Sequence, residues 1–152
     1  MIILEKIDYN DKELLNKILL WRNDNITRQY SNNSNVITED IFKIIINKYK
    51  ESTIDPLIIK YNNINVGIIT FVLSNDIYYI GINIDPDYRN KHIGNLSLQY
   101  LLENYKKYFN MNITIHALIK KENKSSLKLF SKYFDYLNED DDNIVYYKNF
   151  II

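Results

Sequence analysis

The segment IYYIGINIDPDYRNKHIGNLSLQYLLENYKKYF, residues 77–109, decides the fold of this protein. Its beginning is rich in β-branched and aromatic side chains, which predicts a strand over residues 77–85. Apolar residues then recur at helical spacing between Ile93 and Tyr105, which predicts a helix with one buried face. A strand that leads through a polar turn into a helix directs several backbone N–H groups toward one point at the start of that helix.

The turn DPDYRNKHIG, residues 85–94, has the features of an anion-binding site. The start of a helix carries partial positive charge, and Arg89 and Lys91 add full positive charges beside it. Gly94 lacks the Cβ that would otherwise keep a ligand away from the backbone. The turn is therefore predicted to hold a pyrophosphate group. The alternative is a basic helix start that contains a glycine by chance.

The remaining chain alternates predicted strands and helices without an internal repeat or a linker. Asn10 or Asp11 is expected to cap the first helix, which ends near Arg22 or Asn23 because polar, turn-forming residues follow. Thr38 is expected to start the second helix. The predicted strands are residues 2–7, 56–61, 65–73, 77–85 and 112–119 and a hairpin within 134–150, and the last helix is residues 123–133. The side chains expected to be buried in the second helix are Ile41, Phe42, Ile44, Ile45 and Tyr49.

This order predicts an α/β fold with a central mixed, mostly antiparallel sheet flanked by helices. Along the chain the predicted order is β-α-α-β-β-β-α-β-α-β-β, with short turns joining the strands of a central meander. A length of 152 residues is typical of one domain, so a single domain over residues 1–152 is expected.

Composition excludes several classes of function. Nineteen Lys and Arg balance nineteen Asp and Glu, which argues against a nucleic-acid-binding protein. The chain has no cysteine and only two histidines, His92 and His116, so no metal site is expected. No apolar run approaches the roughly 20 residues of a membrane span, and no signal peptide is evident. A cytoplasmic protein without membrane contact is expected, in the host cytoplasm if the AT-rich coding bias is viral.

Two motifs resemble those of a known family. Arg89-x-x-His92-x-Gly94 resembles the Arg/Gln-x-x-Gly-x-Gly/Ala signature of the GNAT acetyltransferases, which bind acetyl-CoA. The segment NKSSLKLFSK, residues 123–132, resembles their second motif, in which an asparagine opens the helix after the fifth strand. The predicted order of elements also resembles that of the family over almost the whole chain. The resemblance implies the GNAT fold and an N-acetyltransferase with acetyl-CoA as donor.

The resemblance also implies a set of cofactor-binding residues. The pantetheine arm would pair with the strand backbone, the pyrophosphate would lie on the N–H groups of residues 91–95, Asn123 would hydrogen-bond the pantetheine, and Phe130 would line the thioester pocket. The residues expected to bind acetyl-CoA are Ile82, Asn83, Ile84, Arg89, Asn90, Lys91, His92, Ile93, Gly94, Asn95, Asn123, Ser126 and Phe130.

Three residues depart from the family pattern. His92 stands where a glycine is usual, and Tyr133 stands where a glycine usually ends the helix. Phe130 occupies the place of a tyrosine that many members use to protonate the departing CoA thiolate. A phenylalanine cannot donate a proton, so the proton is expected from water or a neighbouring tyrosine. Loss of one proton donor costs about 10²–10⁴-fold in rate.

Direct attack of an amine on the thioester is the reaction that the resemblance implies, and Asn123 and His116 are its predicted catalytic residues. His116 is the only histidine on a central strand, where Thr114, His116 and Leu118 share one face. Members that acetylate protein N-termini tend to carry a glutamate base near the position of Leu118, which makes His116 the candidate base here. The alternative is a partly buried histidine that is bonded to a neighbouring strand or helix.

The N-terminal third resembles the acceptor lid of GNAT enzymes that acetylate nucleotide-linked amino sugars. The resemblance rests on LWRND at residues 20–24, YSNN at 30–33 and ITED at 37–40. It implies that Arg22 binds a nucleotide phosphate and that Tyr30 and Tyr79 present flat surfaces to a sugar or base, with Asn33 beside them. The alternatives are a buried Trp21 and an Arg22 that interacts with the helix dipole.

The predicted substrate is therefore a nucleotide-linked amino sugar of glycan biosynthesis, a UDP- or dTDP-linked 4-amino-4,6-dideoxyhexose. The first alternative is acetylation of a protein N-terminus, a polyamine or another small amine, and the second is an acyl-CoA-binding module without turnover. A homodimer is also considered, because the apolar C-terminal strand at residues 146–152 either pairs across a dimer or completes the sheet. Tyr146 and Tyr147 within it are expected to pack.

Overall fold

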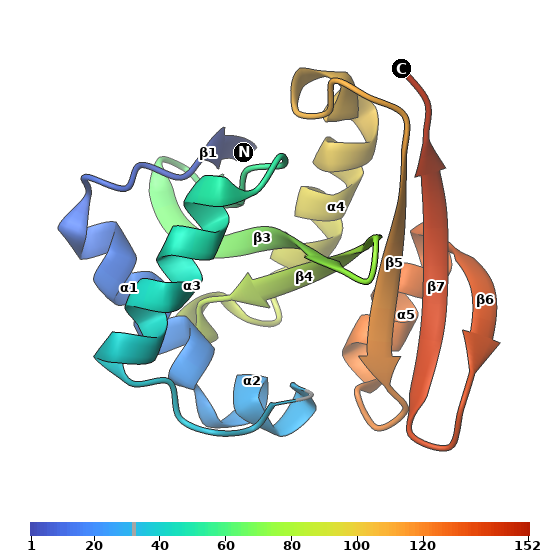
Figure 1. Ribbon diagram of the computed structural model, residues 1–152, viewed down its shortest axis with the longest axis horizontal. Helices are drawn as coiled ribbons and strands as arrows, with labels where there is room; N and C mark the ends of the chain where they lie inside the picture. Colours follow the sequence, from blue (N-terminus) through green and yellow to red (C-terminus); the bar gives the residue numbers. More distant parts are fainter. Residues whose placement is uncertain (32) are drawn as a thin grey trace.

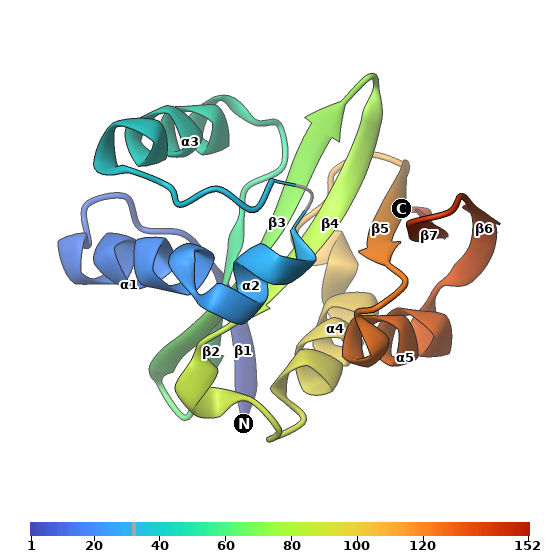
Figure 2. The same cartoon turned by 90° about the horizontal axis from the view of Figure 1, so that it is seen from below.

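A seven-stranded mixed sheet with helices on both faces forms the protein (Figures 1 and 2). The computed structural model describes residues 1–31 and 33–152. Its strands are β1 (Ile2–Lys6), β2 (Leu57–Tyr61), β3 (Ile64–Ser74), β4 (Ile77–Ile84), β5 (Ile113–Lys120), β6 (Asp135–Glu139) and β7 (Asn143–Phe150). Its helices are α1 (Lys12–Asn23), α2 (Asn25–Tyr30), α3 (Glu39–Glu51), α4 (Ile93–Asn104) and α5 (Lys124–Tyr133), with 3₁₀ turns at Pro86–Tyr88 and Tyr105–Lys107. The predicted α/β class and the mostly antiparallel sheet are confirmed.

Side-chain caps set most of the helix boundaries that the sequence predicts. The Asp11 carboxylate accepts a hydrogen bond from the backbone N–H of Leu14 at 3.0 Å, and α1 ends at Asn23 as expected. Thr38 caps α3 and Asn123 caps α5 in the same way. Each capping side chain satisfies one of the N–H groups that the first turn of a helix leaves free.

Helix α2 is absent from the predicted order of elements. The polar composition of residues 24–35 predicts a loop, yet Asp24 accepts a hydrogen bond from the backbone N–H of Thr27 at 3.1 Å and starts a six-residue helix. Aspartate with threonine three residues later is a helix-start pattern that the turn-rich composition obscures. The chain therefore contains one more helix than expected, and that helix lies in the predicted acceptor lid.

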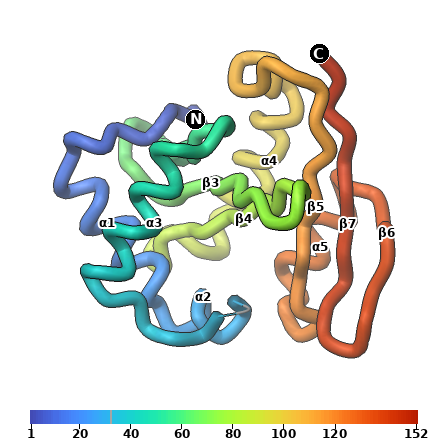
Figure 3. Tube along the Cα trace, viewed as in Figure 1, coloured from blue at the N-terminus to red at the C-terminus, as the bar shows by residue number. Residues whose placement is uncertain are grey.

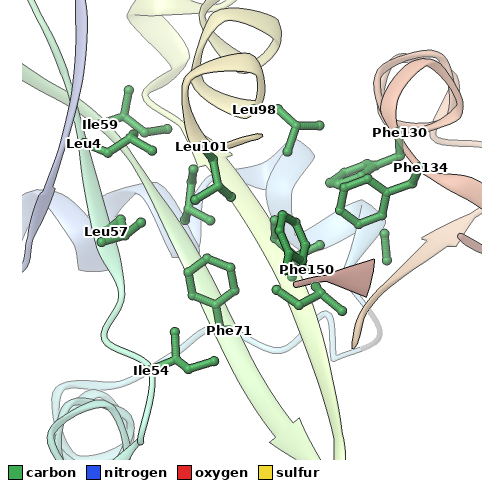
Figure 4. Close-up of a cluster of buried hydrophobic side chains, with 14 of the residues drawn as sticks. Leu4, Ile54, Leu57, Ile59, Phe71, Leu98, Leu101, Phe130, Phe134 and Phe150 are labelled. Carbon is green, nitrogen blue, oxygen red and sulfur yellow. The ribbon is translucent and has the colours of Figure 1, made fainter. Parts of the chain in front are cut away.

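The helices cover the two faces of the sheet in separate groups, with α1 and α3 on one face and α4 and α5 on the other (Figure 2). Apolar side chains from the sheet, α4 and α5 form the larger core (Figure 4). The inward face of α3 consists of Phe42, Ile46 and Tyr49, whereas Ile41 and Ile44 are 45% and 56% exposed, contrary to expectation. The observed spacing of four and three residues is that of one helix face. Among the described residues, no helix is long and apolar enough to cross a membrane.

Strands β4 and β5 separate soon after they meet. They are the parallel pair of the sheet, and their register holds only at Tyr78↔Ile115 and Tyr79↔His116. Beyond these pairs β4 stays bound to β3 as far as Ile84, while β5 runs in another direction (Figure 1). The edge of β4 that faces β5 therefore has backbone groups without a strand partner at residues 80–84.

The C-terminal strand β7 is an inner strand of the sheet. Strand β7 pairs with β5 along Asn143–Phe150 and with β6 on its other side. Strand β6, all of whose residues are exposed, is the edge of the sheet instead. Pairing of β7 across a dimer is therefore ruled out, and a homodimer through any other surface stays a prediction.

Candidate active site

The N-terminus of α4 differs from those of the other α-helices in the described part of the chain. Helices α1, α2, α3 and α5 each begin with a side-chain cap. His92 precedes α4 without forming a side-chain cap hydrogen bond, so the first N–H groups of α4 are not capped by a side chain. An uncapped helix start of this length offers several aligned donors and a partial positive charge to an anion.

The turn before α4 has the backbone conformation that the predicted cradle requires. Asn90 and His92 both have a φ of 61°, in the left-handed region that glycine adopts most readily. His92 thus keeps the conformation of the glycine that is usual at its position, and its imidazole is placed on the surface. The departure from the family pattern at His92 changes the side chain and leaves the path of the turn intact.

Gly94 leaves space in front of the first turn of α4. A Cβ at this position would come no closer than 3.5 Å to the Leu129 side chain, which is an ordinary contact, and the φ of Gly94 is not positive. A Cβ on Gly67, in contrast, would lie 2.6 Å from the carbonyl oxygen of Asn83, so the sheet itself requires that glycine. Neither backbone strain nor packing within the chain requires a glycine at position 94, whereas close approach of a ligand to the backbone would.

The two basic residues of the turn face different surroundings. Lys91 is exposed, and its ammonium lies 5.3 Å from the centre of the Tyr88 ring. The guanidinium of Arg89 is directed to the lid instead, where it donates to the Asp24 carboxylate at 2.7 Å and to the Thr27 hydroxyl at 3.2 Å. Of these two predicted phosphate ligands, Lys91 has its charged group in solvent, whereas the charged group of Arg89 is already paired with Asp24.

The ion pair with Arg89 affects the pKa of the Asp24 carboxyl group. Partial burial acts to raise its pKa, but the hydrogen bonds from Arg89 and from the backbone N–H of Thr27, together with the Arg89 charge, outweigh it. The net effect is a pKa of Asp24 below its ordinary value. Asp24 therefore remains a carboxylate at neutral pH and compensates the charge of Arg89.

Asn123 lies at the end of β5, across the gap from the end of β4. Its Oδ1 accepts hydrogen bonds from the backbone N–H of Ser126 and from the Ser125 hydroxyl, each at 3.3 Å. Its Nδ2 makes no hydrogen bond within the described residues, so the amide has a donor available for a ligand. Because β4 and β5 are parallel, the starts of α4 and α5 lie at the same edge of the sheet.

The side chains of two other predicted cofactor residues contact other residues of the protein. Asn95 accepts a hydrogen bond from the Tyr133 hydroxyl, which connects the first turn of α4 to the end of α5. Phe130 is 4% exposed and packs edge-on against Phe134 with ring centroids 5.3 Å apart. The ring of Phe130 therefore belongs to the larger core, where burial of an aromatic ring stabilises the fold.

The residues that resemble the sugar-acetylating enzymes build the lid. Trp21 is 2% exposed, as its alternative reading predicts, and its Nε1 donates to Asp85 at 3.0 Å. The side-chain amide of Asn23 donates to the carbonyl of Ile37 at 2.8 Å and accepts from its N–H at 2.7 Å. Both side chains therefore hold the backbone of the segment that is predicted to form the acceptor lid.

Arg22 contacts α3. Its Nη1 donates to the Tyr49 hydroxyl at 3.2 Å, and its Nε is buried without a hydrogen-bond partner among the described residues. Burial raises the pKa of Tyr49 although the Arg22 charge and hydrogen bond act against that shift. Arg22 also lies in the last turn of α1, where a cation interacts favourably with the helix dipole. Its predicted role as a phosphate ligand gains no support from this position.

Helix α2 connects the separated ends of β4 and β5. The Thr27 hydroxyl donates to Oδ1 of Asn83 at 3.2 Å, and the Lys120 ammonium donates to the carbonyl of Gln29 at 3.2 Å. The tube in Figure 3 shows α2 below β4 and near the lower end of β5. Tyr30 is the half-buried last residue of this helix. Thr27 and Lys120 are site residues that the sequence patterns did not identify.

The loop after α2 contributes little to the candidate site. Oδ1 of Asn33 accepts a hydrogen bond from the backbone N–H of Asn35 at 3.1 Å, so this side chain shapes its own turn. Asn32, which belongs to the same predicted motif, lies outside the described residues.

The exposed face of β5 lies beside the lid. Thr114, His116 and Leu118 share this face as predicted, and Leu118 is 39% exposed. The half-buried His116 packs edge-on against the Tyr79 ring at a centroid distance of 5.8 Å. In register on its other side is Tyr147 of β7, which the sequence patterns assigned only to packing. A central strand that pairs on both sides brings these three rings into one row across the sheet.

Comparison with known proteins agrees with the fold. The model of the acetyltransferase (GNAT) family matches residues 20–136, most of the chain. The chain therefore belongs to the acetyltransferase (GNAT) family. It is an acyltransferase enzyme that uses acetyl-CoA, as the two predicted motifs imply.

Several solved structures have the same fold. A domain from Methanocaldococcus jannaschii DSM 2661 is 26% identical with a TM-score of 0.75, over 99% of each chain. The Campylobacter jejuni N-acetyltransferase PseH in complex with acetyl coenzyme A is 18% identical with a TM-score of 0.70, over 97% of this chain and 98% of that one. RimL, a ribosomal L7/L12 alpha-N-protein acetyltransferase in complex with coenzyme A, is 17% identical with a TM-score of 0.76, over 97% and 93%. No curated protein sequence matches the chain.

Proposed function

We propose that this enzyme acetylates the amino group of a nucleotide-linked amino sugar, a UDP- or dTDP-linked 4-amino-4,6-dideoxyhexose, in glycan biosynthesis. The observation that carries the acceptor class is the surface between α2 and β5. Neither the residues of α2 nor the exposed face of β5 includes a carboxylate, and both include cations and aromatic or imidazole rings. Such a surface suits an acceptor that has negative charge and a flat base.

The cofactor half of the proposal rests on the residues around the gap between β4 and β5. When bound, acetyl-CoA supplies the activated acetyl group as a thioester. The uncapped N–H groups at residues 93–95 and the exposed Lys91 would hold its pyrophosphate, and the free edge of β4 at residues 82–84 would pair with its pantetheine arm. Asn123 has a free amide donor for the same arm. The space in front of Gly94 fits this assignment.

The acceptor half uses residues from three elements. Tyr30 of α2 and Tyr79 of β4 would contact the sugar and the base, and Lys120 would face the diphosphate. His116 is the candidate base, because it lies on the exposed face of β5 in contact with Tyr79. As the amine nitrogen bonds to the acetyl carbon, the carbon–sulfur bond breaks, and His116 takes the amine proton directly or through water.

The proton for the departing thiolate comes from outside the position of Phe130. Its buried ring has no donor group and lies in the core. Because CoA thiolate is a good leaving group, a proton from water would be sufficient for this step. The proposed mechanism therefore depends more on a general base that takes the proton of the amine than on a general acid that protonates the thiolate.

Leu118 distinguishes this acceptor from a protein N-terminus. It is 39% exposed on the face of β5 that also bears His116, so the position borders the acceptor side. A glutamate there would provide the general base expected for a protein-directed member, and leucine cannot. Structures with this fold include RimL and a putative phosphinothricin N-acetyltransferase, so the acceptor has to be argued from such side chains and not from the fold.

A thiol-release assay tests the proposal. Acetyl-CoA is offered with UDP- and dTDP-linked 4-amino-4,6-dideoxyglucose, with spermidine and with a peptide that has an N-terminal alanine. We expect turnover with a sugar nucleotide and at least about tenfold lower kcat/KM with the other amines, since they lack the diphosphate contact. Preferred turnover of the peptide or spermidine would contradict the acceptor class.

Two neighbouring lysines provide a matched pair of variants for this assay. Lys120→Gln removes the ammonium that contacts α2 and is expected to raise the KM for the sugar nucleotide about tenfold. Lys121→Gln removes an exposed ammonium that pairs with Glu139 at 3.0 Å, outside the acceptor side, and should leave that KM unchanged. Equal effects of the two variants would mean that Lys120 has no specific role toward the acceptor.

A further inference from the structure

We propose that Arg89 is a positioning residue that couples the acceptor lid to the acetyl-CoA turn, so that binding of the cofactor orders the lid. This inference rests on the proposed function only for the place of acetyl-CoA. The family signature implies that Arg89 binds a phosphate. In this proposal its guanidinium instead connects the cofactor turn to the lid.

The contacts of Arg89 lead away from the turn in which it lies. Its Nη2 donates to the Asp24 carboxylate at 2.7 Å and to the Thr27 hydroxyl at 3.2 Å. Asp24 in turn accepts from the backbone N–H of Thr27 at 3.1 Å and thereby starts α2. One guanidinium therefore holds both the cap and the first turn of the lid helix.

A second connection joins the same lid residues to β4. The Thr27 hydroxyl accepts a hydrogen bond from Arg89 and can donate its own proton to Oδ1 of Asn83 at 3.2 Å. Asn83 lies on the free part of β4, where the pantetheine arm is expected to pair. Trp21 adds a third connection, since its Nε1 donates to Asp85 at 3.0 Å just before the turn.

Helix α2 depends on these connections. It has six residues, none of them buried, and helices shorter than about 12 residues are marginal without tertiary contacts. The side chains of Arg89 and Asp24 are 27% and 20% exposed, so their ion pair is partly shielded from solvent and salt. The lid helix is therefore held in part by groups that belong to the cofactor turn and to β4, in addition to its contact with Lys120 of β5.

The coupling follows from this dependence. A cofactor that binds the turn at residues 89–95 and the free edge of β4 fixes the same backbone that holds Arg89 and Asn83. A fixed Arg89 and Asn83 lower the cost of ordering α2, and by linkage an ordered lid favours the bound cofactor equally. Acetyl-CoA would thus prepare the acceptor side before the acceptor arrives.

Hydrogen exchange of residues 25–31, measured by mass spectrometry with and without saturating acetyl-CoA, tests the inference without an acceptor. The affinity for acetyl-CoA is measured separately by calorimetry. The variants are Arg89→Gln, Asp24→Asn and the two combined, since asparagine keeps the helix cap and removes only the charge. Lys91→Gln tests a predicted phosphate contact. Lys60→Gln removes another ion pair, Lys60 with Glu5 at 3.1 Å, which joins β2 to β1 and does not involve the lid.

We expect acetyl-CoA to slow the exchange of residues 25–31 in the wild-type protein and to lose this effect in both single variants. Their affinity for acetyl-CoA should change by less than about threefold, and the double variant should resemble either single one because one interaction is removed in all three. Lys91→Gln should weaken binding about tenfold yet retain the slowed exchange at saturation. Lys60→Gln should change neither measurement, and Arg89→Lys should retain part of the coupling.

Two results would overturn the inference. One is a loss of acetyl-CoA affinity greater than about tenfold in Arg89→Gln but not in Asp24→Asn, which would make Arg89 a phosphate ligand. The other is an exchange rate of residues 25–31 that acetyl-CoA does not alter in a wild-type protein that binds it. Failure of the wild-type protein to bind acetyl-CoA would instead reject the cofactor site itself, and the choice of sugar acceptor plays no part in any of these outcomes.

Discussion

The acetyl-CoA turn and the acceptor lid satisfy their polar groups in opposite ways. At the start of α4 the backbone N–H groups have no side-chain cap, and Gly94 leaves the space before them open. In the lid, the polar side chains of Asn23, Asp24 and Thr27 are already hydrogen-bonded within the protein, to Ile37, Arg89 and Asn83 respectively. A backbone site is available to a ligand as it stands, whereas these polar side chains of the lid hold the lid itself in place.

The difference teaches how each sequence motif should be interpreted. The turn motif predicts ligand contacts because its function resides in backbone groups that a short turn and a glycine leave free. Residues 21–24 predict a lid, but the groups that we propose to contact the acceptor lie elsewhere, on Tyr79, His116 and Lys120. Perturbing the two regions separately should therefore give separable effects.

The largest effect is expected at the acceptor side from His116→Gln. If His116 is the base, kcat/KM for the sugar nucleotide falls by about 10²–10⁴-fold, while the affinity for acetyl-CoA is unchanged. Steady-state rates measured across pH provide the test, because the pH–rate profile of the variant should differ from that of the wild type. A variant with the wild-type pH–rate profile would remove His116 as the base and leave it a packing partner of Tyr79.

At the cofactor side, Gly94→Val is expected to weaken acetyl-CoA binding by roughly tenfold to 100-fold, the equivalent of about 1–3 kcal/mol of steric cost. The fold should persist, because a Cβ there meets only the Leu129 side chain at 3.5 Å. Gly67→Val is the contrasting variant, since its side chain would collide with the sheet. Calorimetric binding and thermal melting measure both effects, and unchanged acetyl-CoA affinity of the Gly94 variant would reject the cradle.

Asn123 tests whether one residue serves both the fold and the cofactor. Asn123→Ala removes the cap of α5 and should cost about 1 kcal/mol of stability together with a roughly tenfold loss of turnover. Asn123→Asp keeps the cap but lacks the amide donor, so it should retain the melting temperature and still lose turnover. Wild-type kinetics for the aspartate variant would confine Asn123 to its capping role.

Phe130→Tyr is expected to act on stability and not on turnover. Its ring is 4% exposed beside Phe134, so an added hydroxyl without a partner should lower the free energy of unfolding by about 1–3 kcal/mol. Urea unfolding and thiol release measured on the same protein separate the two effects. Faster turnover with unchanged stability would show that Phe130 borders the thioester after all.

The smallest effect is expected from acidification of the lid. Because the pKa of Asp24 is lowered in the folded protein, its ion pair stabilises the fold fully above the unfolded value of about 3.9 and is lost as the pH falls through the folded value. Asp24→Asn should therefore be less stable than the wild type near pH 6, by about 1 kcal/mol, with the difference shrinking toward pH 3. Urea unfolding at both pH values measures it, and a difference that does not depend on pH would contradict this account of Asp24.

The sequence predicts the sheet and most helix starts because these depend on local patterns. Asp11, Thr38 and Asn123 cap the helices that follow them, and alternation of apolar residues identifies β5 together with its exposed face. The short helix α2 was missed because its stability comes from contacts with distant residues and not from its own composition. Arg89 and Asp24, which form that contact, are 65 residues apart in the chain.

The sequence predicts the side-chain positions of the candidate site less well than it predicts the fold. Residues 91–95 and Asn123 lie around the starts of α4 and α5, as the sequence predicts, because these positions follow directly from strand and helix ends. The orientations of the Arg22 and Phe130 side chains do not follow from the sequence, since one contacts α3 and the other packs in the core. Which way a long or aromatic side chain turns depends on tertiary neighbours that a motif does not specify.

Backbone amide NMR of the wild-type chain during titration with acetyl-CoA tests the central claim most directly. The claim is that the uncapped turn before α4 and the free edge of β4 hold the cofactor, while the lid responds to it. The expected result is that the largest shifts occur at residues 91–95 and 82–84, followed by smaller shifts at 25–31. Largest shifts elsewhere, with residues 91–95 unmoved at saturation, would contradict it.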